Sequence, residues 1–221
     1  MSGSDPETDN GHVGTQLIPL FPLSLVLLPA MPLPLHIFED RYKEMMGDII
    51  PVDGEFGVVL AKDDGIVNIG CTATVVNVMR KYPDGRMDLV AAGQRRFIIE
   101  SLDEEKAYLR ANVSYFDDED LRTVPMDLQR RASATFQRLM SVERPSVTSE
   151  ESGGSVRLSF QIGQLINDLD KRQTVLALRS EVERLEYLVK VVPEYLIQRE
   201  QIALAKRVGP LNGHAKHVTE G

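Results

Sequence analysis

The sequence predicts an α+β protein in which a β-rich part comes first and a helical part follows. Up to about residue 120 the apolar residues form short runs or alternate with polar ones, whereas from Met126 onward they recur every three or four positions. A β-rich half followed by several helices is typical of α+β folds. The chain has 221 residues, of which 43% are hydrophobic and 26% charged, as in an ordinary globular protein.

The stretch from Leu17 to Leu35 contains no charged side chain but has five prolines. An apolar run of this length suggests a membrane helix or a secretory signal. The prolines remove N–H donors that a membrane helix needs, and no Lys or Arg precedes Arg41. We therefore predict three buried extended pieces with the sequences LIPLF, LVLLP and PLPLH, and no membrane span. Leu35 and Phe38 are predicted to be buried where these strands meet the first helix.

The next elements follow from periodicity and turn signals. Apolar residues at helical spacing from Phe38 to Ile49 predict a short amphipathic helix, and FGVVLA at 56–61 predicts a buried strand. The PDG triplet at 83–85 lies between two strand-like runs and predicts a hairpin. Gly93 is expected to break the strand that follows this hairpin. Alternation from Ala107 to Tyr115 predicts a strand with one solvated face.

The helical part shows two apolar stripes before its last and longest helix. One stripe runs from Leu128 to Met140 and the other from Leu158 to Leu169, separated by a loop rich in Ser, Glu and Gly. Ser180 and Glu183 match a capping box at the start of the last helix. Pro193 is expected to kink this helix without ending it, because periodic apolar residues continue to Leu204.

Three segments resemble one known family. PLFPLSLVLLPAMPLPLHIFEDRY (19–42), GCTATVVNVMRKYPDGRMDLVAAGQRRFII (70–99) and YLRANVSYFDDED (108–120) are similar to blocks of the N-terminal domain of Lon-type proteases, which also occurs in cereblon and in stand-alone bacterial proteins. The resemblance covers roughly 17–208. It implies a PUA-like β pseudo-barrel at 16–122 followed by a helical bundle at 123–208. Residues 1–15 and 209–221 are predicted to be a disordered leader and a disordered tail.

The sequence offers little for catalysis, so no enzyme activity, cofactor or metal site is expected. It contains no phosphate-binding loop of the G-x-x-x-x-G-K-[ST] type, and the ATPase and protease modules that Lon proteases carry have no counterpart before Gly221. His36 is interpreted as a structural residue, and Cys71 lies in an apolar setting that makes a thiol inert. A mobile pair, His214 and His217, is a poor metal site. The acidic run at 117–120 is interpreted as a solvated surface, with cation binding as the alternative.

Binding is the function that remains. The resemblance implies a module that holds unfolded or extended polypeptides, as an adaptor or client binder with a protease or ATPase partner. The candidate contact residues are Met31, Met79 and Met87, whose flexible side chains suit varied ligands, with Arg95 and Arg96 as hydrogen-bond donors. As the alternative, PUA folds elsewhere recognise RNA. Net charge is −8, and the first 120 residues are strongly acidic, which argues against nucleic acid. A single cysteine suggests the cytoplasm.

Overall fold

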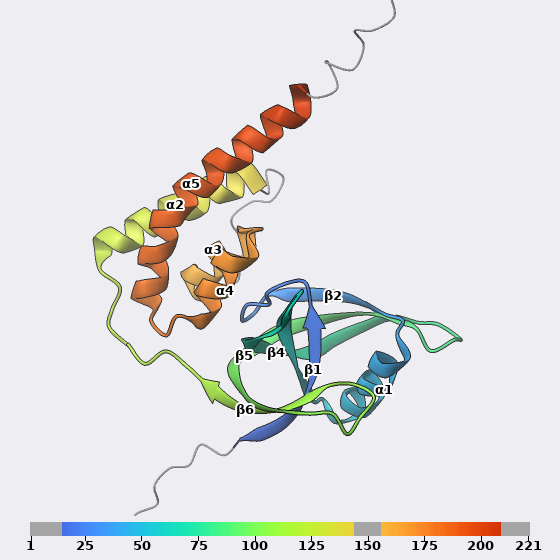
Figure 1. Ribbon diagram of the computed structural model, residues 1–221. Coiled ribbons are helices and arrows are strands. Elements are labelled where there is room, and N and C mark those ends of the chain that lie inside the picture. Colours follow the sequence, from blue (N-terminus) through green and yellow to red (C-terminus); the bar gives the residue numbers. More distant parts are fainter. Residues whose placement is uncertain (1–14, 144–155, 209–221) are drawn as a thin grey trace, which may run out of the picture. The chain divides into compact units, whose positions relative to one another are not determined.

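The computed structural model describes residues 15–143 and 156–208, with side chains described as far as residue 201 (Figure 1). The chain divides into two compact units at 1–117 and 118–221, which we call the β unit and the helical unit. The predicted boundary lay between 122 and 123, five residues later. The predicted leader at 1–15 and tail at 209–221 lie outside the described residues, except for Thr15.

One mixed sheet forms the β unit. Its strands are β1 (Gln16–Leu23), β2 (Pro32–Ile37), β3 (Glu55–Lys62), β4 (Gly65–Lys81), β5 (Met87–Asp103) and β6 (Arg110–Phe116). Their order is β2-β5-β4-β3-β1-β6, and β6 also pairs with β5. That extra pairing closes β5, β4, β3, β1 and β6 into a ring and leaves β2 outside it. Figure 1 labels these strands. The closed ring is the expected pseudo-barrel, and the α+β class is confirmed.

The core of the β unit combines the inward faces of the strands with one helix. Helix α1 (Asp40–Ile49) buries one face, and a 3₁₀ turn, η1 (Ile50–Val52), follows it directly. Gly70 leaves room for the ring of Phe97, because an added Cβ would lie 2.5 Å from the ring's Cζ. Each large apolar side chain buried here contributes about 1.5–3 kcal/mol. Among the largest are Phe56, Phe97, Ile18, Leu20, Met45 and Met46.

The middle of the three predicted proline-rich strands is not a strand. Val26, Leu27 and Leu28 are buried in an irregular segment that ends in a turn, where Ala30 has a φ of 61°. The segment lies against Gly93, whose carbonyl accepts a hydrogen bond from the Ala30 N–H at 2.8 Å. Gly93 does not break β5, contrary to the prediction. It lets the Leu28 backbone approach a strand that continues to Asp103.

Phe38 is not in the core, and the prediction of its burial was wrong. It is 58% exposed and its ring stacks on that of His36, with the centroids 5.9 Å apart. β2 alternates, so Leu33 and Ile37 are the buried residues and Leu35 is half-buried. Phe38 follows Ile37 along the chain and therefore takes the outward direction.

The helical unit contains α2 (Met126–Glu143), α3 (Leu158–Leu165), α4 (Leu169–Ala177) and α5 (Glu181–Val208). The second predicted stripe belongs to two helices, because the chain becomes extended at Ile166 and Asp168. The Asp168 side chain caps α4 by accepting the Lys171 N–H at 2.9 Å. Helix α5 continues past Pro193 as predicted. Ser180 Oγ accepts the Glu183 N–H at 3.3 Å, as expected for the serine of a capping box.

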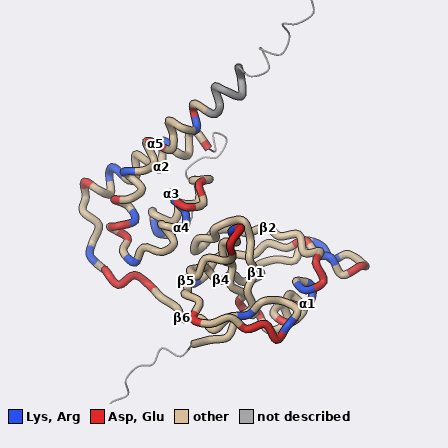
Figure 2. The backbone as a smooth tube through the Cα atoms, in the orientation of Figure 1, with Lys and Arg blue, Asp and Glu red and all other residues tan. Residues whose placement is uncertain are grey.

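The acidic run at 117–120, drawn in red after β6 in Figure 2, belongs to the helical unit except for Asp117. It is not simply solvated. Asp118 is buried and binds the guanidinium of Arg184 through both carboxylate oxygens, at 2.7 and 2.6 Å. Arg184 is 0% exposed, and its other N–H groups donate to Ser159 Oγ, Leu178 O and Glu181 Oε2. Burial works against the charge of Arg184, but the bonds to Asp118 and Glu181 outweigh it, so the pKa of Arg184 is raised.

Candidate functional site

Strand β4 extends beyond its neighbour β3 and leaves part of its edge open. Thr74 pairs with Glu55, the first residue of β3. From Val75 to Lys81, β4 pairs with β5 on one side, and no strand of the described chain pairs with it on the other. A strand edge of this kind presents backbone N–H and C=O groups to which an added strand can bond. We call residues 75–81 the open β4 edge.

Two irregularities in the β4–β5 ladder lie within the open β4 edge. The register shifts between Val75 and Asn77 and again between Val78 and Arg80. The residues passed over, Val76 and Met79, are 65% and 64% exposed. Bulges kink a strand and redirect side chains. Here they coincide with two apolar side chains that point to solvent on an otherwise unpaired edge.

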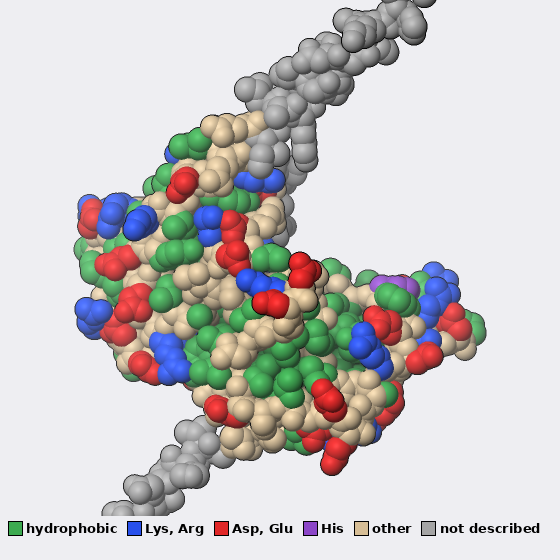
Figure 3. Space-filling model, in the orientation of Figure 1, with side chains coloured by type: hydrophobic (Ala, Val, Ile, Leu, Met, Phe, Trp, Pro, Cys, Tyr) green, Lys and Arg blue, Asp and Glu red, His purple; other side chains and the backbone are tan. Residues whose placement is uncertain are grey.

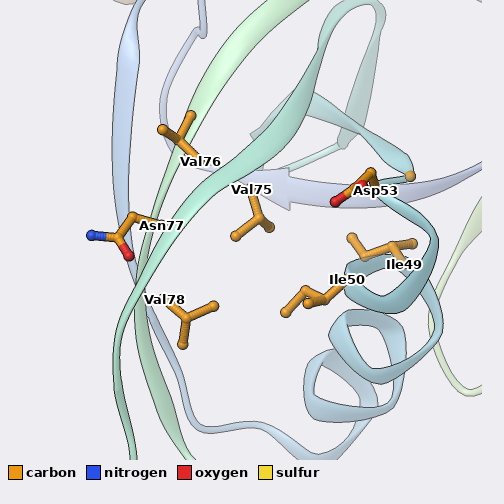
Figure 4. Close-up of a pocket in the computed structure, with 8 residues that line it drawn as sticks. Ile49, Ile50, Asp53, Val75, Val76, Asn77 and Val78 are labelled. Carbon is orange, nitrogen blue, oxygen red and sulfur yellow. The ribbon is translucent and has the colours of Figure 1, made fainter.

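A hollow of about 190 Å³ lies beside the first half of the open β4 edge (Figure 4). Val75 and Val78 point into it from β4, and Ile49 and Ile50 face them from the end of α1 and from η1. Asp53 stands at the same site, in a left-handed conformation with a φ of 49°. The wall is therefore mostly aliphatic, with one carboxylate beside it, which suits an apolar side chain.

Strand β2 offers another edge, but that edge is less suited to pairing. β2 pairs with β5 on one side, and Pro32 and Pro34 carry no N–H. Proline at alternate positions is a common way to prevent an edge strand from accepting a further strand. The open β4 edge contains no proline between Val75 and Lys81.

Comparison with known proteins identifies the family. The substrate-binding domain of the ATP-dependent protease La (LON) family matches residues 17–193. The chain belongs to this family. It is 23% identical to the Lon protease of Roseiflexus castenholzii over 93% of this chain and 30% of that protein. It is 27% identical to the Lon protease of Flavobacterium johnsoniae over 54% of this chain and 16% of that protein. The chain thus matches less than a third of the length of these proteases.

Solved structures of Lon N-terminal domains share the fold. A Lon N-terminal domain protein from Xanthomonas campestris aligns with a TM-score of 0.64 at 22% identity, over 79% of this chain and 98% of that one. The N-terminal domain of the Lon protease of the Mycobacterium avium complex aligns with a TM-score of 0.57 at 15% identity, over 80% and 98% of the two chains. At these identities the likeness concerns the fold alone.

Within this Lon-family fold, the five predicted contact residues do not form one cluster. Met79 lies on the open β4 edge, and Met87 begins β5 opposite Lys81. Met31 precedes β2 and accepts the Gly93 N–H at 3.0 Å, so it lies at the other end of β2 from Met87, about 20 Å away. Arg95 pairs with Glu55 at 3.1 Å and covers the Tyr115 ring at 3.7 Å. Arg96 is buried, over the Phe116 ring.

The sequence analysis missed the residues that line the hollow. Val75, Val76 and Val78 were assigned to a hairpin strand, and Ile49 to the core face of a helix. The run VVNVM at 75–79 could have indicated these residues, because it places apolar side chains at both odd and even positions of a strand. Such a pattern marks a strand with two apolar faces, one of which here remains uncovered.

His36 and Cys71, which the sequence analysis considered for catalysis, lie in surroundings typical of structural residues. His36 Nδ1 lies 2.5 Å from Asp88 Oδ1, and the Tyr82 hydroxyl donates to Asp88 Oδ2 at 2.7 Å. The contact with His36, and after it the hydrogen bond from Tyr82, holds the pKa of Asp88 below its usual range. Burial raises the pKa of Cys71 to about 12, so the thiol is protonated at neutral pH. Within residues 15–143 and 156–208, no three His, Cys, Asp or Glu side chains are placed to hold a metal ion. In the same part of the chain, none of the helices has both the length and the apolar composition of a membrane-spanning segment.

The two units differ in the surface they show. On the face drawn in Figure 3, hydrophobic side chains gather over the β unit, and charged side chains surround them. Over the helical unit, basic and acidic side chains are interspersed on that face. Neither pattern is the continuous basic stripe by which a nucleic-acid-binding surface is recognised.

Proposed function

We propose that this chain is a polypeptide-binding module and that the open β4 edge, with the aliphatic hollow beside it, is its binding surface. The observation that carries the proposal is the coincidence of an unpaired, proline-free strand edge with a hollow for an apolar side chain. Family membership supports the same function, since the family is defined as a substrate-binding domain of an ATP-dependent protease.

The edge explains how such a module would tolerate many sequences. An extended segment of a client would pair its main chain with β4 between Val75 and Lys81, a length of about seven residues. Main-chain hydrogen bonds do not depend on side-chain identity, and each contributes about 0.5–1.5 kcal/mol. One apolar client side chain would enter the hollow beside Val75 and Val78. Among the five candidates from the sequence, we retain Met79 as a contact because it lies on this edge and is exposed.

An RNA-binding function receives less support from this surface. The hollow is aliphatic, and the carboxylates of Asp53 and Glu55 lie near one end of the open β4 edge. Carboxylates repel phosphate groups. A groove for RNA is typically lined by cations and by aromatic rings that stack on bases.

The first prediction tests the edge with one charged substitution. Val76→Lys places a charge on the open β4 edge, where an exposed side chain is changed and stability should shift by less than about 0.5 kcal/mol. We expect it to weaken binding of a fluorescein-labelled, valine-rich seven-residue peptide by about tenfold or more, measured by fluorescence anisotropy. Leu102→Lys is the matched control, because Leu102 is also an exposed apolar strand residue but its strand is paired with β6.

A modified peptide separates main-chain pairing from side-chain contact. N-methylation at alternate residues keeps the side chains but removes the N–H donors that strand addition needs. Binding should be lost with the methylated peptide and kept with the Leu102→Lys protein. Equal peptide affinities of the Val76→Lys and Leu102→Lys proteins would show that the open β4 edge is not the binding surface. Absence of peptide binding by the unmodified protein would contradict the proposed function itself.

We also propose that the chain acts as an adaptor or client binder in the cytoplasm rather than as a catalyst, with any ATPase or protease supplied by a partner. The sequence lacks a phosphate-binding loop, and the side chains of His36 and Tyr82 are both hydrogen-bonded to the Asp88 carboxylate. We expect the purified protein neither to hydrolyse ATP nor to cleave unfolded casein over several hours. Phosphate release and gel analysis are the measurements, and activity that copurifies with the chain through two further columns would contradict the proposal.

A further inference from the structure

The open β4 edge has an unpaired negative charge at one end. Asp53 is exposed, stands beside the hollow, and forms no ion pair with any described residue. The neighbouring carboxylate of Glu55 has a partner, since it binds Arg95 at 3.1 Å. Asp53 therefore keeps its charge available to a ligand.

The opposite end of the edge has unpaired positive charges. Arg80 and Lys81 are both exposed and form no ion pair within the described part of the chain; the guanidinium of Arg80 lies over the Tyr82 ring at 4.6 Å. The carboxylates near them are already occupied. Asp88 is held by His36 and Tyr82, and Asp84 binds Arg86 at 2.7 Å.

The two charged ends act independently on a ligand. Six residue steps separate Val75 from Lys81, or about 20 Å along an extended strand. This exceeds the Debye length of about 8 Å at physiological ionic strength, so each end attracts or repels only the nearest part of a bound segment. A segment with charges of opposite sign at its two ends can satisfy both.

The direction of the added segment follows from β3. β3 pairs antiparallel to β4 and begins at Glu55, opposite Thr74. A segment on the open β4 edge lies on the line of β3, just before its first residue, and antiparallel pairing is slightly more stable per residue than parallel pairing. In that direction the segment's N-terminal end lies at Arg80 and Lys81, and its C-terminal end lies at Asp53.

We propose that the open β4 edge selects extended segments by the order of their charges, with an acidic residue first, a central aliphatic residue in the hollow, and a basic residue last. This rests on the proposed polypeptide-binding function and assigns Asp53, Arg80 and Lys81 the role of setting the direction and register of the client.

The test uses two labelled seven-residue peptides of identical composition. One has two Glu at its N-terminal end, a Val-rich centre and two Lys at its C-terminal end; the other has these charges exchanged, and both are acetylated and amidated so that terminal charges do not contribute. By fluorescence anisotropy at 50 mM salt, the acid-first peptide should bind about five- to tenfold more tightly. At 500 mM salt the ratio should approach one because both ends are screened.

Two variants tie the preference to the named residues. Asp53→Asn and the double variant Arg80→Gln, Lys81→Gln should each reduce the logarithm of the affinity ratio between the two peptides by about half. Both variant proteins should still bind the peptides through their Val-rich centre. Equal binding of both peptides at low salt, or a preference for the basic-first peptide, would overturn the charge order and leave the proposed function standing. Failure of both peptides to bind would overturn both.

Discussion

Replacing Gly93 with alanine is expected to destabilise the β unit by roughly 3 kcal/mol or more. An added Cβ would lie 2.2 Å from the Leu28 carbonyl oxygen and 3.1 Å from its carbon, and both are backbone atoms that cannot rotate away. Overpacking alone costs about 1–3 kcal/mol. The hydrogen bonds that join Gly93 to Ala30 and Met31 would also lengthen, each at about 1 kcal/mol.

Hydrogen exchange followed by mass spectrometry measures this effect unit by unit in the full chain. Peptides from β4 and β5 should exchange much faster in the Gly93→Ala protein, whereas those from α2 should not. Gly47→Ala is the matched control, because a Cβ at Gly47 has nothing within 4 Å and the position is helical, so the change should be neutral or stabilising by up to about 1 kcal/mol. Identical exchange in the two variants would show that the Leu28 segment does not pack on Gly93.

Replacing Asp118 with alanine is expected to cost the helical unit about 3–5 kcal/mol, because it leaves the guanidinium of Arg184 buried with too few acceptors. Arg184 lies against the Phe160 ring at 4.6 Å and has no access to water, so solvent cannot replace the lost carboxylate. The salt bridge of Arg157 to Asp118 at 2.8 Å is lost with the same substitution. Exchange of α3 and α5 peptides should accelerate, and thermal unfolding should begin at lower temperature.

Neighbouring carboxylates provide the control for this result. Glu119 pairs with Arg179 at the surface, and exposed pairs contribute about 0–1 kcal/mol, so Glu119→Ala should change stability little. Asp118→Asn should fall between the two, since an amide keeps the shape and one oxygen acceptor. Equal stability of the Asp118→Ala and Glu119→Ala proteins would mean that Asp118 is solvated, as the sequence alone suggested.

Much of the fold was predictable because it depends on neighbours in sequence. The PDG triplet indicated the β4–β5 hairpin, and the stripe from Leu128 to Met140 matches the buried face of α2. Ser180 marked the start of α5, since a cap acts within three residues. The order of elements, and therefore the α+β class, followed from these local signals.

The candidate site was predicted only in part, because its main feature is the difference in extent between two neighbouring strands, β4 and β3. Met79 was named, but the open β4 edge exists because β4 continues for seven residues beyond the one that pairs with the start of β3. Neither strand shows this difference in its own sequence. The hollow likewise needs Ile49 and Val78, which are 29 positions apart, to face each other.

The sequence by itself determined the alternation, turns, caps and helical stripes, which arise from backbone geometry over a few residues. Tertiary structure decided which polar groups are buried and which apolar ones are exposed. Asp118 is held inside by an arginine 66 residues away, Gly93 accommodates the backbone of Leu28, and Phe38 is exposed because β2 turns its neighbour Ile37 inward. Burial is a property of all the elements that surround a side chain, so a short stretch of sequence cannot specify it.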